Sequence, residues 1–88
     1  MTDAEARAII LNALAKAGVL NVDEHARFTR DPAADVPLAA LGIDSMAAMN
    51  FCVALEEVLL RDVEIEELVE NASLARLARH LALRASQS

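Results

Sequence analysis

An all-α fold is predicted for this chain, a small four-helix bundle with three long helices, a short third helix and a long first loop. Three observations predict it. Hydrophobic residues make up 56% of the 88 positions, yet aromatic residues make up only 2%, and small aliphatic side chains suit closely packed helices. Two Gly and two Pro give too few turns for a sandwich or barrel. Apolar residues recur at helical spacing in separate stretches. One small core, and therefore a single domain over residues 1–88, is expected.

The first helix is predicted over residues 3–17. Thr2 and Glu5 have the spacing of a capping box, in which each side chain accepts a hydrogen bond from the other residue's backbone N–H. Gly18 is expected to end the helix in the left-handed conformation. One helical face carries the apolar side chains Ala6, Ile10, Ala13, Leu14 and Ala17.

A long loop is predicted over residues 19–41. Pro32 and Pro37 each disfavour helix at the preceding residue, although residues 23–28 could form a short turn of helix. Scattered apolar side chains should anchor this loop to the core, and we expect these to be Val22, Phe28, Leu38 and Leu41.

The junction after this loop carries the candidate site, with Gly42, Asp44 and Ser45 in close sequence. Gly42 permits a sharp turn, and Asp44 can accept hydrogen bonds from the free N–H groups of a helix start. Ser45 then lies in the first turn, where a phosphate on its hydroxyl would be favoured by roughly 0.3–1 kcal/mol. A serine beside an ordinary helix cap, with no further task, remains the alternative.

The second helix is predicted over residues 45–60. At about 100° per residue, one sector that should face the core holds Phe51, Cys52, Leu55 and Leu59. The adjoining sector holds Met46, Met49 and Val53, which either pack in the core or form a surface for partner proteins, where Met is an adaptable contact residue. Cys52 is interpreted as a buried apolar residue, because no base lies near it in sequence.

The remaining chain is predicted to form a short helix over residues 64–69, with Ile65, Leu68 and Val69 facing inward, and a final helix capped by Ser73. Residues 85–88 should fray. Half of the fourteen acidic residues lie between positions 56 and 70, which predicts a solvated face that could also steer a basic partner. The apolar stripe of the final helix consists of Leu74, Leu77, Ala78 and Leu81.

Composition excludes several functions. The net charge of −6 disfavours nucleic acid as a partner, and no stretch reaches the roughly 20 apolar residues of a membrane span. One cysteine fits a reducing cytoplasm, so a soluble cytoplasmic monomer is expected. His25 and His80 lack the spacing of metal ligands, and we expect both at the surface. A small core leaves little room for an active-site cavity, and the Gly-x-Ser-x-Gly motif of serine hydrolases is absent, so no enzyme and no catalytic residue are predicted.

Gly42-Ile43-Asp44-Ser45-Met46 resembles the Gly-x-Asp-Ser-Leu motif of the acyl carrier protein family, including the peptidyl carriers, with Met in place of Leu. The resemblance covers about the whole chain. It implies that a phosphopantetheinyl transferase attaches 4′-phosphopantetheine from coenzyme A to Ser45, with Asp44 and Gly42 completing the motif. The modified chain, a phosphoprotein, would then carry acyl or aminoacyl groups as thioesters. It also implies that a loading enzyme and downstream synthase or tailoring enzymes are partners, and that the helix bearing Met46, Met49 and Val53 is their recognition surface.

One departure from the family pattern concerns the pathway. Carriers of fatty-acid synthesis usually bear acidic residues directly after the serine, where this chain has Ala47, Ala48 and Asn50. The resemblance therefore favours a discrete carrier of polyketide or nonribosomal peptide biosynthesis. A fatty-acid-synthesis carrier and a helical protein-interaction module without an arm are the alternatives.

Overall fold

The computed structural model describes residues 1–87, and the side chains of residues 1–85. Within the described part the regular structure is helical. The α-helices are α1 (Asp3–Lys16), α2 (Val22–Arg30), α3 (Ser45–Leu59), α4 (Ile65–Glu70) and α5 (Leu74–Gln87), and a 3₁₀ helix, η1 (Leu38–Leu41), precedes α3. The predicted all-α class is confirmed, with long helices α1, α3 and α5 and short α4.

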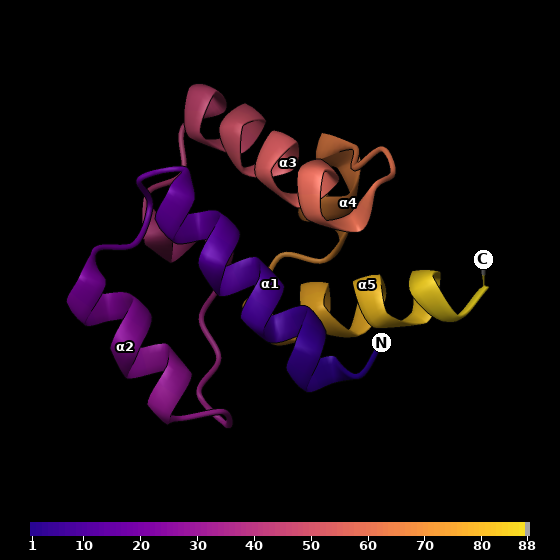
Figure 1. Cartoon of the computed structure of the whole chain (residues 1–88). Helices are drawn as coiled ribbons and strands as arrows, with labels where there is room; N and C mark the ends of the chain where they lie inside the picture. Colours follow the sequence, from indigo (N-terminus) through magenta and orange to yellow (C-terminus); the bar gives the residue numbers. More distant parts are fainter. Residues whose placement is uncertain (88) are drawn as a thin grey trace.

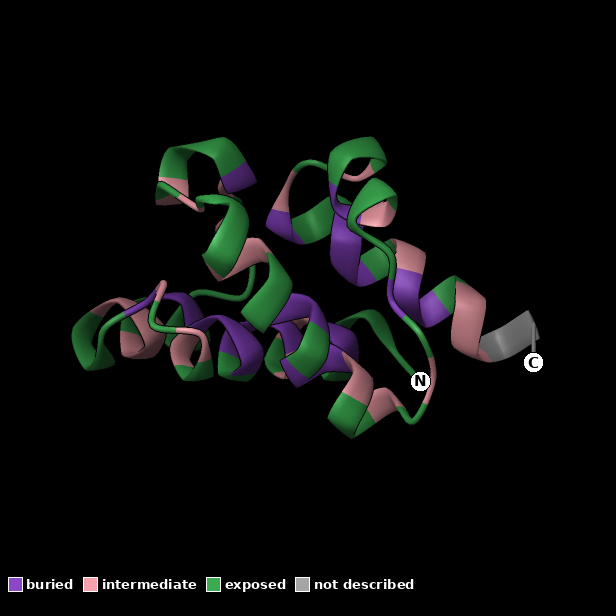
Figure 2. Ribbon diagram, turned by 90° about the horizontal axis from the view of Figure 1, so that it is seen from above, coloured by how far each residue is buried: buried purple, intermediate pink, exposed green. Residues whose placement is uncertain are grey.

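Helix α1 is the centre of the bundle. It contacts α5, α3 and α2, and Figure 1 shows it running between α2 and α5 with α3 across its other side. The ribbon faces that point between the helices are the buried ones (Figure 2). The largest fully buried side chains come from α1, α3 and α5, and they are Ile10, Leu14, Phe51, Leu55, Leu74, Leu77 and Leu81. The predicted apolar stripe of the last helix is confirmed, since Ala78 is buried as well.

The predicted ends of the first helix are nearly correct. Thr2 and Glu5 form the expected capping box, with N···O distances of 2.9 and 3.1 Å. The helix ends at Lys16, one residue before the predicted end, and Gly18 has the left-handed conformation with φ of 80°.

The predicted long loop contains a helix of nine residues, α2, where only a short turn was expected. Asn21 caps it through a second capping box with Glu24. Two side chains of α1 fasten α2: Asn12 hydrogen-bonds His25 at 2.7 Å, and Arg7 donates to the carbonyl oxygen of Phe28 at 3.0 Å.

Three of the four predicted loop anchors contact the core. Phe28 and Leu38 are buried, and Leu41 is partly buried against the core. The prediction for Val22 is wrong, because this side chain is 84% exposed. Val22 is the first residue of α2, and that short helix buries only Phe28, which lies on a different face.

The end of the loop is paired with the start of α5. The Leu38 amide donates to the Ala72 carbonyl oxygen at 2.9 Å, and the Leu74 amide donates to that of Val36 at 3.0 Å. Asp35 accepts a hydrogen bond from the Ala75 amide at 2.8 Å, and this bond is the main reason that the pKa of Asp35 lies below its ordinary value. Ser73 also accepts from the Arg76 amide, as a cap should. These bonds fix the chain that leads into α3.

Predictions for the second half of the chain need corrections. Of the three α4 residues expected to face inward, only Leu68 is buried, while Ile65 is 45% and Val69 72% exposed. Leu59 does pack against the core, as expected, although it is only partly buried. Helix α5 continues to Gln87, so residues 85–87 are helical where fraying was expected, and Ser88 lies outside the described residues.

Candidate functional site

The chain turns sharply before α3. Gly42 ends η1 with φ of 68° and ψ of 34°, a left-handed conformation that side chains with a Cβ disfavour. A Cβ at this position would meet no atom within 4 Å, so the backbone conformation, and not crowding, favours glycine. Asp44 then caps α3, with its Oδ1 accepting a hydrogen bond from the Ala47 amide at 2.7 Å. Both features agree with the sequence predictions.

Ser45 is the first residue of α3 and its side chain is exposed. The start of α3 carries the positive end of the helix dipole, and after the Asp44 cap the first turn contains no acidic residue that would offset it. An exposed hydroxyl at such a position can be approached by a second protein, and it can hold a phosphate group favourably.

Met46, Met49 and Val53 are exposed by 73, 60 and 51% respectively. Simple packing in the core is therefore excluded for these side chains. They form an apolar strip on α3 that begins next to Ser45, while Phe51, Cys52 and Leu55 on the other face are buried. We refer to Met46, Met49 and Val53 as the apolar strip.

A second apolar feature beside Ser45 was missed by sequence analysis. It is an open pocket of about 210 Å³ between η1, the first turns of α3, and α4. The sequence gives no clear signal for it, because the three apolar residues assigned to the inner face of α4 have the spacing of an ordinary buried stripe. The lining residues of this α4 pocket are Leu38, Ala39, Ile43, Ala48, Ile65, Leu68, Val69 and Ala72.

A network around Glu67 was also missed, because the acidic segment was interpreted as a solvated face. The Glu67 side chain is only 13% exposed and forms ion pairs with His80 and Arg84 of α5. Burial alone would raise the pKa of Glu67, but hydrogen bonds from Arg84, the Glu64 amide and His80 outweigh it and lower the pKa from 4.5 to about 2. His80 is therefore a hydrogen-bond partner of a largely buried carboxylate and not simply a solvated group.

The other candidate reactive groups have structural partners. Burial, helped by the charge of Glu56, raises the pKa of the Cys52 thiol, which opposes formation of a nucleophilic thiolate. His25 is bonded to Asn12. Among residues 1–87, no group of three His, Cys, Asp or Glu side chains is arranged to hold a metal ion, and no helix is long and apolar enough to cross a membrane.

Residues 11–81 match a protein-family model described as "Phosphopantetheine attachment site". Comparisons with curated proteins and with solved structures gave no match. The matched range contains the Gly42 turn, the exposed serine, the apolar strip and the α4 pocket. The chain therefore belongs to the phosphopantetheine attachment-site family, whose members are carriers that hold thioesters on covalently attached 4′-phosphopantetheine.

Proposed function

We propose that Ser45 is the attachment point of 4′-phosphopantetheine, and that the chain is a carrier of polyketide or nonribosomal peptide biosynthesis. The observation that supports this most is the exposed hydroxyl of Ser45 in the first residue of α3. In this proposal residues 1–88 form one carrier domain that acts as a monomer in the cytoplasm.

The residues around Ser45 fit the arm. Asp44 and Gly42 hold the chain in the turn that presents the hydroxyl, and the start of α3 favours the negative charge of the phosphate. When bound, the group supplies a terminal thiol that carries acyl or aminoacyl groups. Because the thiol stays tethered to Ser45, each intermediate meets a docked enzyme at high effective concentration. The chain contributes the anchor and the docking surface, while the chemistry belongs to its partners.

The apolar strip is proposed as the contact surface for those partners, which are a phosphopantetheinyl transferase, a loading enzyme and downstream synthase or tailoring enzymes. Its side chains are exposed, and the neighbouring positions carry Ala47, Ala48 and Asn50 instead of acids. Apolar docking of this kind should depend little on salt, whereas docking through an acidic helix should weaken as salt screens it. The lack of acidic residues at these positions supports polyketide or peptide biosynthesis over fatty-acid synthesis as the context.

Attachment is tested by the intact mass of the protein after incubation with coenzyme A and a broad-specificity phosphopantetheinyl transferase. We expect a gain of one phosphopantetheine in the wild type and none in Ser45→Ala. A gain that persists in Ser45→Ala would place the arm elsewhere. No gain in either protein would favour the alternative, a helical interaction module without an arm.

Docking is tested by the rate of arm attachment in Met49→Glu, with Val58→Glu as the matched control. The two side chains are equally exposed on α3, at 60 and 59%, but Val58 lies near its far end. We expect slower attachment only in Met49→Glu, with unchanged helicity. Equal rates would remove the strip from the proposal, and a steep loss of wild-type rate with added salt would favour the fatty-acid alternative.

A further inference from the structure

The residues of helix α4 themselves make few contacts, although hydrogen bonds of Val63 and Ala72 hold the chain before and after it. It has six residues, of which only Leu68 is buried, and helices this short are not stable alone in water. Among the helices its main packing partner is α3. The remaining apolar residues of α4 are Ile65 and Val69, which are exposed and line the α4 pocket beside Ser45. Any shift of α4 would therefore change the shape of that pocket.

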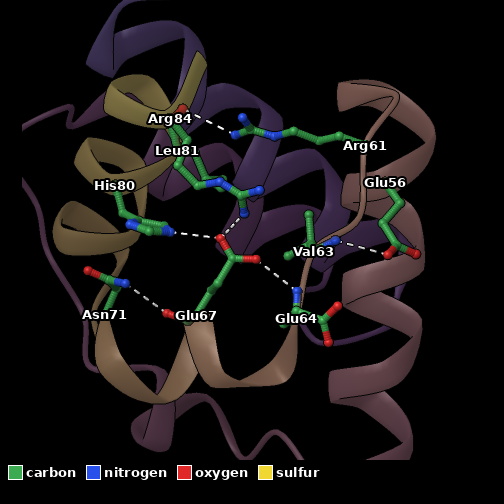
Figure 3. A network of polar contacts seen from close by, with 9 residues as sticks. All are labelled: Glu56, Arg61, Val63, Glu64, Glu67, Asn71, His80, Leu81 and Arg84. Atoms are coloured by element: carbon green, nitrogen blue, oxygen red, sulfur yellow. Dashed lines mark hydrogen bonds and ion pairs between the residues drawn. The ribbon is translucent and has the colours of Figure 1, made fainter. Parts of the chain in front are cut away.

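One carboxylate ties α4 to α5. Glu67 Oε1 accepts hydrogen bonds from Arg84 and, at 2.8 Å, from His80 Nε2, and these two donors lie about one turn apart on α5. Its Oε2 accepts from the Glu64 amide at 2.8 Å and so caps α4 itself. Figure 3 shows the Glu67 carboxylate between the α5 donors and the start of α4. Bonds to a charged acceptor are about twice as strong as those between neutral groups.

The side chains around Glu67 favour its pairing with Arg84 and His80. Glu67, Glu64 and Glu66 line an open hollow with other acids, while His80 and Arg84 line it from α5. Arg61 lies near Arg84 and donates to the carbonyl oxygen of Leu81. Arg84 is the arginine that hydrogen-bonds the Glu67 carboxylate, whereas Arg61 interacts with Glu67 through its charge. The other acids lining the hollow would repel a displaced Glu67.

We propose that the pairing of Glu67 with Arg84 and His80 is a latch that holds α4 against α5 and sets the opening of the α4 pocket beside Ser45. Opening the latch would free α4 to swing on its contact with α3 while the rest of the bundle stays folded. Leu68 connects the two sides, because it follows Glu67 directly in the chain and its side chain lines the pocket. The relevance of the pocket to a tethered intermediate rests on the proposed carrier function, but the latch itself does not.

The test compares Arg84→Met with Arg79→Met in the unmodified protein. Both changes remove an arginine from α5, but Arg79 is an exposed residue that does not bond Glu67. Amide hydrogen exchange measured by NMR should accelerate about tenfold for residues 67–70 in Arg84→Met, with α1 amides unchanged. Relaxation dispersion of the Ile65, Leu68 and Val69 methyl groups should appear in the same variant. Neither change is expected in Arg79→Met.

Acceleration that is uniform over α1, α3 and α5 would mean a loss of global stability and would overturn the latch, as would exchange equal to that of Arg79→Met. Should Arg84→Met not fold, Arg84→Lys keeps a charge but loses the guanidinium geometry, and a smaller acceleration confined to residues 67–70 is expected. If Arg84→Lys shows no acceleration of exchange in α4, the proposal is overturned. Arm attachment to the wild type is measured in parallel, so a failure of the carrier function is read separately from a failure of the latch.

Discussion

Replacing Asp44 by Ala should loosen the first turn of α3. The side chain accepts one hydrogen bond, at 2.7 Å, from the Ala47 amide, and removing such a cap costs about 1 kcal/mol, within a range of roughly 0.5–2 kcal/mol. The negative charge beside the helix start adds roughly 0.3–1 kcal/mol. For a domain of this length, 1 kcal/mol corresponds to a shift of about 4–8 °C in the unfolding temperature. Asp44→Ala should therefore lower that temperature by several degrees.

Asp44→Asn separates the cap from the charge, because asparagine caps helices about as well as aspartate. Thermal unfolding followed by circular dichroism at pH 7 should give a loss for Asn well below that for Ala. Arm attachment, followed by intact mass, should slow in the Ala variant, in which Ser45 lies in a frayed turn, and stay close to the wild-type rate in the Asn variant. Equal unfolding temperatures for the two variants would refute the assignment of Asp44 as a stabilising cap, and equal attachment rates would refute its role in presenting Ser45.

Three further outcomes follow from the structure. Gly42→Ala should cost about 1 kcal/mol from the left-handed backbone alone, since no atom obstructs a Cβ, and chemical denaturation measures it; a loss above 3 kcal/mol would indicate a clash. Phe51→Ala, at a fully buried position, should cost about 3–5 kcal/mol in the same assay, and a loss under 1 kcal/mol would contradict its place in the core. The Glu67 carboxyl should titrate in ¹³C NMR with a midpoint at about 2, and a midpoint near 4.5 would contradict the network. Because this pKa lies below 4.5, the ionised carboxylate stabilises the folded state by about 3 kcal/mol at most. That stabilisation is complete above pH 4.5 and is lost as pH falls through 2.

The long helices were predictable because each has a repeated apolar stripe. For helix α2 the sequence pattern predicts only a short turn, because this helix buries only Phe28 and therefore has no apolar stripe to detect. Its start did carry a signal: Asn21 and Glu24 have the same capping-box spacing as Thr2 and Glu5. A cap alone, without a stripe behind it, is a weak indication of a nine-residue helix.

The site was predictable where it depends on neighbours in sequence and not where it depends on packing. Gly42, Asp44 and the exposed position of Ser45 follow from the local motif. The α4 pocket depends on which side of a six-residue helix meets α3, and three apolar positions in so short a segment do not decide this. The ion pairs of Glu67 join residues 13 and 17 positions apart, a separation at which no local pattern connects them.

The pairing of residues 36–38 with the start of α5 has a practical consequence for engineering. Asp35 and the Leu38 and Leu74 amides fasten the chain downstream of Ala33, an exposed residue. A doubled loop length costs only about 0.6 kcal/mol in closure entropy. An affinity tag or a fluorescent-label sequence inserted at Ala33 would therefore lengthen the loop before the hydrogen bonds of residues 35–38. The hydroxyl of Ser45, which follows these bonds in the chain, would keep its position for incoming enzymes.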